Sequence, residues 1–314
     1  MRILVTGAAS HLAAVLLPRL CLHPAVEQVT GLDLKPGRYH HPRYHHLRGD
    51  VRDRRLLARI HRQQRPDAVI HLAFVVLRSQ LGRRRHDREL IRDINVNGSR
   101  AVFDSACAAG VSCLLHLSSA AVYGAWPDNP PRIAENQPRR VMHGFSYAED
   151  KNAVEDLLDA LQERTAGPRV VCLRPHVILG HNAQPFLTAL LRQPFYPRFA
   201  PPAPLTQCVW ETDVVDAILA SLLRPVHGPF NLASEPAMSF AAMQRQAHRL
   251  AIPLPFGLLR WSQRRLWRLT AALEEPGWLD GMPHSLALDC GRARRLLGWA
   301  PRYDTTACIR MLVR

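Results

Sequence analysis

Short apolar runs alternate with longer helical stretches through the first 175 residues of the chain. Most of these runs are rich in Ile, Val or Leu, which predicts a buried strand. The runs lie at Arg2–Thr6, Gln28–Asp33, Ala68–Ala73, Cys113–Ser118 and Val170–Arg174. Apolar residues at helical spacing predict helices over Ser10–Leu22 and Glu89–Ala109. Strands that alternate with helices form a parallel sheet covered on both faces, and right-handed crossovers make it doubly wound. The predicted fold class is therefore α/β with a doubly wound parallel sheet.

Proline becomes dense after Pro175, which excludes central strands and helix interiors from the next stretch. The prolines concerned are Pro194, Pro197, Pro201, Pro202 and Pro204. We expect a smaller, irregular lobe to begin there, over the carboxyl ends of the strands. The predicted first domain spans residues 1–175 and is completed by about 207–236, and the lobe is built from 176–206 and 237–314.

Arginine dominates the charge of the chain. Lysine and arginine total 41 against 26 acidic residues, a formal net charge of +15, and only Lys35 and Lys151 are lysines. Such an excess is typical of proteins that bind nucleic acid, anionic lipid or phosphorylated substrates. A general preference for arginine over lysine explains it equally well.

Neither cysteine nor histidine forms a pattern that indicates a metal site. The seven cysteines are scattered without a C-x-x-C pair, so no zinc site or disulfide framework is predicted, and free thiols fit the cytoplasm. His40, His41, His45 and His46 cluster without neighbouring carboxylate or thiol ligands, which favours a solvated loop.

No apolar run is long enough to predict a transmembrane helix. The segment Leu258–Leu273 is amphipathic, with tryptophan and leucine among arginines. Such a helix can lie on a membrane surface, but packing on its own domain is the favoured interpretation.

The turn after the first strand has the composition of a phosphate-binding loop. Gly7 leaves space for close backbone approach, and Ser10 and Ala13 keep the following positions small. We expect Gly7, Ser10, His11 and Leu12 to bind a dinucleotide at the start of a helix. Asp33 ends the second strand, where a carboxylate binds the adenosine ribose and favours NAD. Lys35 and Arg38 follow closely, so NADP stays open.

A second motif places three reactive side chains in reach of one another. Tyr147 and Lys151 are one helical turn apart on the same face. An ammonium near a phenol is expected to lower the phenol pKa, which makes Tyr147 a general acid or base. Ser118 and Ser119 end a strand at the carboxyl edge, where ligands bind such sheets.

These motifs together resemble the extended short-chain dehydrogenase/reductases, the NAD-dependent epimerase/dehydratase group, over nearly the whole chain. The matching segments keep the order and spacing of that group. They are VTGAASHLA (5–13), Asp33, GDV (49–51), HLA (71–73), NVNG (95–98), SSAAVYG (118–124), YAEDK (147–151), LRPHVILG (173–180) and ARRLLGWAP (293–301). The resemblance implies a Rossmann-type sheet with a smaller C-terminal substrate domain.

The resemblance also implies roles for individual residues. Ser119 and Tyr147 act on the substrate, and Lys151 also holds the nicotinamide ribose. The remaining implied cofactor contacts are Asp50 and Val51 beside the adenine, Leu72 and Ala73 along the cofactor channel, Asn95 supporting the nicotinamide loop, Ser118, and Pro175 against the nicotinamide. Family members often dimerise through two helices per chain, here Glu89–Ala109 and Tyr147–Glu163, so a homodimer is expected.

The implied activity is hydride transfer at a carbinol or carbonyl carbon of a small molecule, with NAD(P) and Ser-Tyr-Lys acid/base chemistry. Nucleotide-sugar members usually have asparagine at the position of Val177 and arginine near Thr206 and Gln207, so both differences weaken that substrate class. One alternative is nonetheless a nucleotide-sugar 4-epimerase with tightly bound NAD. Another is a non-catalytic dinucleotide- or nucleic-acid-binding protein. Such a protein would have no need of the serine, tyrosine and lysine motif, which disfavours this alternative.

Overall fold

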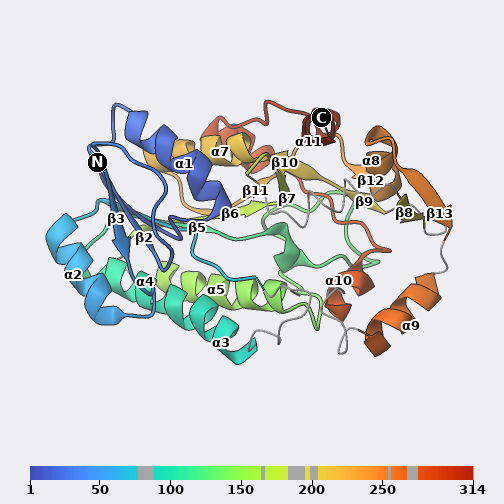
Figure 1. The fold of residues 1–314 in the computed structure, drawn as a ribbon, viewed down its shortest axis with the longest axis horizontal. Coiled ribbons are helices and arrows are strands. Elements are labelled where there is room, and N and C mark those ends of the chain that lie inside the picture. Colours follow the sequence, from blue (N-terminus) through green and yellow to red (C-terminus); the bar gives the residue numbers. More distant parts are fainter. Residues whose placement is uncertain are drawn as a thin grey trace.

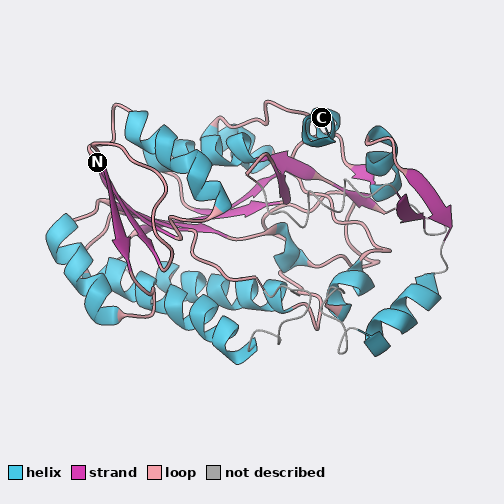
Figure 2. Cartoon of the chain, viewed as in Figure 1, coloured by secondary structure: helices cyan, strands magenta, loops and turns pink. Residues whose placement is uncertain are grey.

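The computed structural model describes residues 1–76, 88–163, 167–182, 195–198, 204–253, 256–266 and 275–313. Within them, seven parallel strands form one sheet in the order β11-β6-β5-β4-β1-β2-β3 (Figures 1 and 2). The strands are β1 Arg2–Thr6, β2 Gln28–Asp33, β3 Tyr44–Arg48, β4 Ala68–His71, β5 Cys113–Leu117, β6 Arg169–Pro175 and β11 Gly228–Leu232. The predicted doubly wound α/β sheet is confirmed.

Successive side chains of a strand point to opposite faces, and these strands carry apolar residues on both faces. Helices therefore cover the sheet on both sides. Helices α1 (His11–Leu22) and α7 (Glu211–Leu223) lie on one face (Figure 1). The other face is covered by α2 (Arg54–Gln64), α4 (Gly98–Ala108) and α5 (Ser146–Gln162). Two separate cores result, which is the expected burial pattern of a parallel sheet.

The remaining described elements are short, and most of them lie in the second part of the chain. They are α3 Arg88–Arg92, η1 Asp93–Asn97, η2 Ala120–Tyr123, β7 Val177–Leu179, β8 Phe195–Arg198, β9 Leu205–Thr206, β10 Cys208–Trp210, β12 Met238–Ser239, α8 Phe240–Gln246, β13 Leu250–Pro253, α9 Phe256–Leu266, α10 Pro276–Gly281, η3 Ala293–Leu297 and α11 Thr305–Val313. Three two-stranded pairs, β10–β7, β12–β9 and β13–β8, lie beside the carboxyl end of the main sheet.

Two predicted elements differ from the structure in shape. The strand predicted over Ala68–Ala73 ends at His71, because the chain leaves the sheet to meet the Gly7 turn. The single helix predicted over Glu89–Ala109 is interrupted by the π-helical turn η1, where the Asn95 side chain bonds outside the helix.

The polar stretch before Asp50 contains a strand that the sequence analysis missed. His45 and His46 belong to β3 and not to a loop, so that expectation is wrong for these two histidines. Within the described ranges, no group of three or more His, Cys, Asp or Glu residues could hold a metal ion. None of the helices described is both long and apolar enough to cross a membrane.

Candidate active site

The predicted site residues follow the carboxyl ends of neighbouring strands. Thr6, His71, His116 and Cys172 are paired in register across β1, β4, β5 and β6. Because parallel strands end at one edge, the segments after them meet there. The Gly7 turn, the Leu72–Phe74 segment and the two serines thus share one edge of the sheet.

Gly7 fits its position because two constraints exclude a side chain. Its φ is +73°, and an added Cβ would lie 2.5 Å from the Ala73 nitrogen. The Gly7 amide donates to the Leu32 carbonyl at 2.9 Å, which fixes the turn against β2. The Gly7 turn therefore packs tightly against the backbone that follows β4.

The start of α1 presents the expected helix terminus. Ser10 is the N-cap, and its hydroxyl accepts from the Ala13 amide at 3.3 Å. His11 is exposed, whereas the Leu12 side chain is buried in the core, so only the Leu12 backbone faces this terminus. The unpaired amides of a first turn attract phosphate oxygens.

Asp33 connects the end of β2 to this turn. Its two carboxylate oxygens accept from the Ala9 and Lys35 amides, each at 2.9 Å. The side chain stays partly exposed, and each oxygen keeps a lone pair for a further donor. The position suits a ribose hydroxyl.

Asp50 belongs to a row of ion pairs, Asp50–Arg52–Asp93, near the same edge of the sheet. Arg52 binds Asp50 at 2.6 Å and Asp93 at 2.8 Å, and the hydrogen bond from Arg52 lowers the Asp50 pKa. Val51 beside it is buried and lies close to Gly98. The Asp50 carboxylate is thus held as an anion by protein groups.

Asn95 supports the segment that follows β4. Its side chain accepts from the Val75 amide at 2.8 Å and donates to the Val75 carbonyl at 2.9 Å. A second donor hydrogen binds Asp150 at 3.0 Å. Asn95 therefore ties the loop after Leu72 and Ala73 to α5.

Ser119 and Tyr147 are brought together as expected. The Ser119 side chain caps η2 by accepting from the Ala121 amide at 3.2 Å, and it lies close enough to the Tyr147 phenol to lower the phenol pKa. Burial raises the Tyr147 pKa, and the Ser119 hydroxyl only partly offsets this effect. The expectation that Lys151 lowers the phenol pKa is therefore wrong.

The reason lies in where Lys151 directs its ammonium. Nζ donates to the Leu117 carbonyl at 2.6 Å and lies 5.9 Å from the Tyr147 ring centroid. The side chain is 4% exposed, and burial lowers its pKa to about 7. At that pKa, the ammonium is charged for only part of the time near neutral pH.

Phe74 is a site residue that the sequence analysis missed. Its ring lies 3.7 Å from Lys151 Nζ and meets the Tyr147 ring edge to face at 5.5 Å. A sequence signal existed, because a large aromatic directly follows the Leu72-Ala73 pair. Phe74 shields both reactive groups from water on one side.

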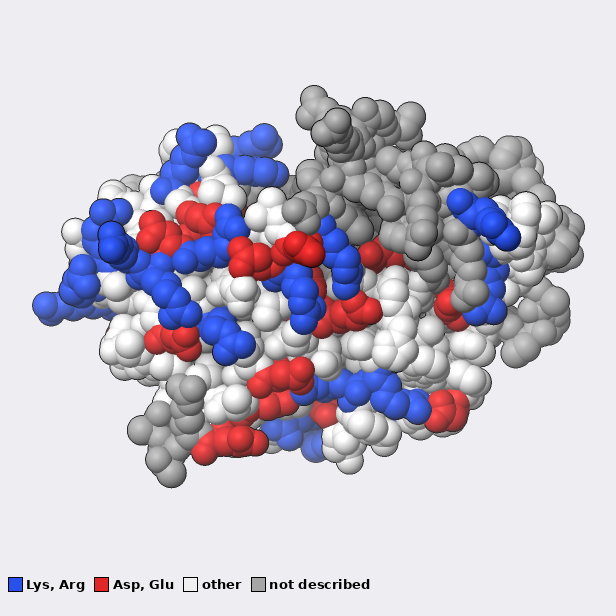
Figure 3. Space-filling view, turned by 90° about the horizontal axis from the view of Figure 1, so that it is seen from below, with Lys and Arg blue, Asp and Glu red and all other residues white. Residues whose placement is uncertain are grey.

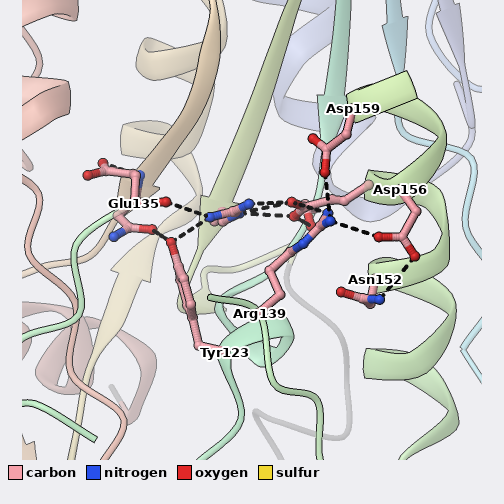
Figure 4. A network of polar contacts seen from close by, with 10 residues as sticks. Tyr123, Glu135, Arg139, Asn152, Asp156 and Asp159 are labelled. Atoms are coloured by element: carbon pink, nitrogen blue, oxygen red, sulfur yellow. Dashed lines mark hydrogen bonds and ion pairs between the residues drawn. The ribbon is translucent and has the colours of Figure 1, made fainter. Parts of the chain in front are cut away.

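Ser118 faces a buried ionic network and not an open surface. Its hydroxyl donates to Glu155, which also binds Arg174 and Arg139 (Figure 4). Arg174 continues to the Tyr123 hydroxyl at 2.7 Å, and Tyr123 donates to Asn231 at 2.8 Å. The network joins α5 to β6 and β11 beneath the site.

The remaining predicted residues have structural partners as well. Pro175 is buried at the end of β6, and Val177 begins β7, which pairs with β10. The Gln207 side chain donates to the Ser234 carbonyl and accepts from the Leu288 amide. Gln207 therefore connects the backbone that follows β11 with the backbone at Leu288.

Comparison with known proteins places the chain among related sequences and folds. The model of the NAD dependent epimerase/dehydratase family matches residues 3–195. An uncharacterised protein of Mycobacterium tuberculosis is 26% identical over 313 residues, covering 96% of this chain and 81% of that protein. The UDP-glucose 4-epimerase of Neisseria meningitidis serogroup C is 29% identical over 191 residues, 55% of this chain and 52% of the relative.

A solved structure shares the fold over the whole chain. The Thermus thermophilus UDP-glucose 4-epimerase, in complex with NAD, superposes with a TM-score of 0.72. It is 22% identical, and the match covers 100% of this chain and 98% of that one.

Proposed function

This chain belongs to the NAD dependent epimerase/dehydratase family, and from that premise we propose that it moves a hydride at a carbinol or carbonyl carbon of a small molecule. The observation that carries the proposal is the closeness of the Ser119 hydroxyl to the Tyr147 phenol, one helical turn from the buried Lys151. A phenol in contact with a second hydroxyl can pass a proton to or from a substrate oxygen.

Each residue has a defined task in this scheme. Tyr147 moves the proton of the substrate hydroxyl, and Ser119 orients the same oxygen. Lys151 donates to the Leu117 carbonyl, and its ammonium carries further N–H donors for ribose hydroxyls. NAD, when bound, takes up or returns the hydride.

The residues at the sheet edge fit a dinucleotide. Gly7 and Ser10 form a turn at a helix N-terminus, and Asp33 offers a partly exposed carboxylate. Asp50, Val51, Leu72, Ala73 and Pro175 line the rest of the proposed channel. NAD is the proposed cofactor, because the Asp33 carboxylate would repel a 2′-phosphate.

A nucleotide-sugar 4-epimerase with tightly held NAD is the second candidate, favoured by the Neisseria relative. Residues 176–206 and 237–314 would then receive the substrate. Val177 and Gln207 offer no charge for a diphosphate, which supports a different small-molecule alcohol or ketone. Seven free cysteines support a cytoplasmic enzyme.

The test compares Tyr147→Phe with Tyr303→Phe, a control beside Trp210 and outside the site. A panel of UDP-hexoses and secondary alcohols is assayed for NAD reduction and for epimerised product. We expect Tyr147→Phe to lower turnover by on the order of 10²–10⁴ with NAD affinity retained. Equal turnover in both variants, or no NAD binding by the unaltered protein, would rule the proposal out.

A further inference from the structure

Exposed large apolar side chains gather in one segment of the second lobe. Leu250 is 65% exposed, Leu258 53% and Trp261 61%, among the highest values for such side chains in the described parts of the chain. Leu250 begins β13, and the other two lie on α9, at the end of the molecule away from β3 (Figure 1). Contact of such side chains with water is unfavourable, so a cluster of them indicates a contact surface.

Among the described residues, helix α9 is attached to α10 on one side and exposes Leu258, Trp261 and Arg265 on another. Arg260 binds Asp280 of α10 at 2.7 Å. Leu258, Trp261 and Arg265 are spaced three and four residues apart, so they share the opposite face of the helix. That face presents leucine, tryptophan and an exposed arginine side by side.

The stretch of sequence that contains this helix is strongly basic. Between Glu235 and Glu274 the sequence contains no acidic residue, but it contains Arg245, Arg249, Arg260, Arg264, Arg265 and Arg268. A second copy of the same surface would therefore bring like charges together, which opposes self-association. An anionic surface is complementary to it.

We propose that α9 is a peripheral membrane contact that lies on a bilayer containing anionic lipid. Leu258 and Trp261 enter the interface between headgroups and acyl chains, where tryptophan is favoured. Arg265, exposed on the same face, binds the anionic headgroups. Arg260, held by Asp280, fixes the helix to α10 so that its free face meets the membrane.

The experiment measures flotation of the full-length protein with vesicles. Phosphatidylcholine vesicles are compared with vesicles that also contain phosphatidylglycerol. We expect binding to the anionic vesicles and a decrease on the order of tenfold or more in the double variant Leu258→Ser/Trp261→Ser. Leu22→Ser, which removes a side chain 71% exposed at the end of α1, is the matched control and should bind normally.

Arg265→Glu tests the electrostatic part without touching the apolar side chains. It should weaken binding to anionic vesicles severalfold, and added salt should weaken it further. Circular dichroism checks that each variant folds. If the double variant does not fold, the vesicle binding of Arg265→Glu tests the proposal. Equal binding to both kinds of vesicle, no binding at all, or a dimer that the double variant dissociates would overturn the proposal.

Discussion

Gly7 occupies a backbone position that excludes every side chain for two independent reasons. Its φ of +73° is unfavourable for other residues, and the Ala73 nitrogen lies where a Cβ would be. Gly7→Ala should therefore lower the free energy of unfolding by roughly 2–4 kcal/mol, by adding overpacking to backbone strain. Urea denaturation measures the loss.

Gly110 provides the control for this prediction. Its φ is +66°, but nothing lies within 4 Å of an added Cβ. Gly110→Ala should then lose only about 1 kcal/mol, the contribution of backbone strain. Equal losses at the two positions would contradict the close approach of the Gly7 turn to β4.

Phe74 controls the environment of Lys151, and its removal should be visible in the pH profile. Burial lowers the Lys151 pKa to about 7 from its usual 10.5. Phe74→Ala admits water to Nζ, so the Lys151 pKa should rise. The inflection of kcat/KM that belongs to Lys151 should then move from about pH 7 to higher pH.

The lowered Lys151 pKa also makes the stability of the fold depend on pH in a defined direction. Between pH 7 and 10.5 the unfolded chain binds the Lys151 proton and the folded chain does not, so the protein gains stability as pH rises. Phe74→Ala should reduce this gain, and Phe74→Leu should largely retain it. An inflection that does not move in Phe74→Ala would exclude this role of the ring.

The chemistry of the site was predictable only where spacing determines it. The four-residue interval between Tyr147 and Lys151 places both on one helix face, and the structure agrees. The direction of the ammonium toward Leu117, and the pKa that follows, depend on β5 and Phe74, which contact Lys151 only through the tertiary fold.

At the scale of elements, α5 is attached to β6 through Glu155. Glu155 is 2% exposed and binds both Arg174 and Arg139. Burial raises its pKa, but the attraction of Arg174 outweighs this, so the Glu155 pKa is lowered. Glu155→Gln would leave Arg174 buried without a counter-ion and should lower the free energy of unfolding by about 3–5 kcal/mol.

Asp156→Asn is the matched control, one residue further along α5. Asp156 also binds Arg139, but its side chain is 57% exposed. Such a pair contributes roughly 0–1 kcal/mol. Chemical denaturation of both variants tests the difference, and similar losses would show that burial does not govern this network.

Elements with strong apolar patterns were predictable from the sequence. β1 and β2 lie at their predicted bounds because buried runs of Ile, Val and Leu specify them. β3 and α2 were missed, since His and Arg dominate both, and Leu57, Ile60 and His61 are the buried residues of α2. The π-helical turn around Asn95 arises from tertiary contacts and has no local signal.

At the scale of the whole molecule, α4 and α5 lie in the same layer and present one continuous face. Figure 3 shows basic and acidic side chains interleaved over this side. Such a surface can pair with a second copy of itself, as the resemblance implied for a homodimer. We propose a homodimer through this face; Ala160 is exposed on α5, so Ala160→Arg should then give a monomer.

Light scattering of the purified protein measures the mass of both forms. Ala14→Arg is the control, because Ala14 is exposed on α1 in the opposite layer. Its mass should match that of the unaltered protein. A monomer without any substitution would remove the proposed interface.

The sheet also has a free edge at β3, whose outer backbone groups have no strand partner among the described residues. Exposed edges of this kind can recruit strands from other molecules and start aggregation. Here the edge strand is only five residues long and carries Arg48 and the exposed His45, with Arg43 just before it. Two such edges would meet with like charges, so the arginine-rich composition also opposes edge-to-edge association of chains at high concentration.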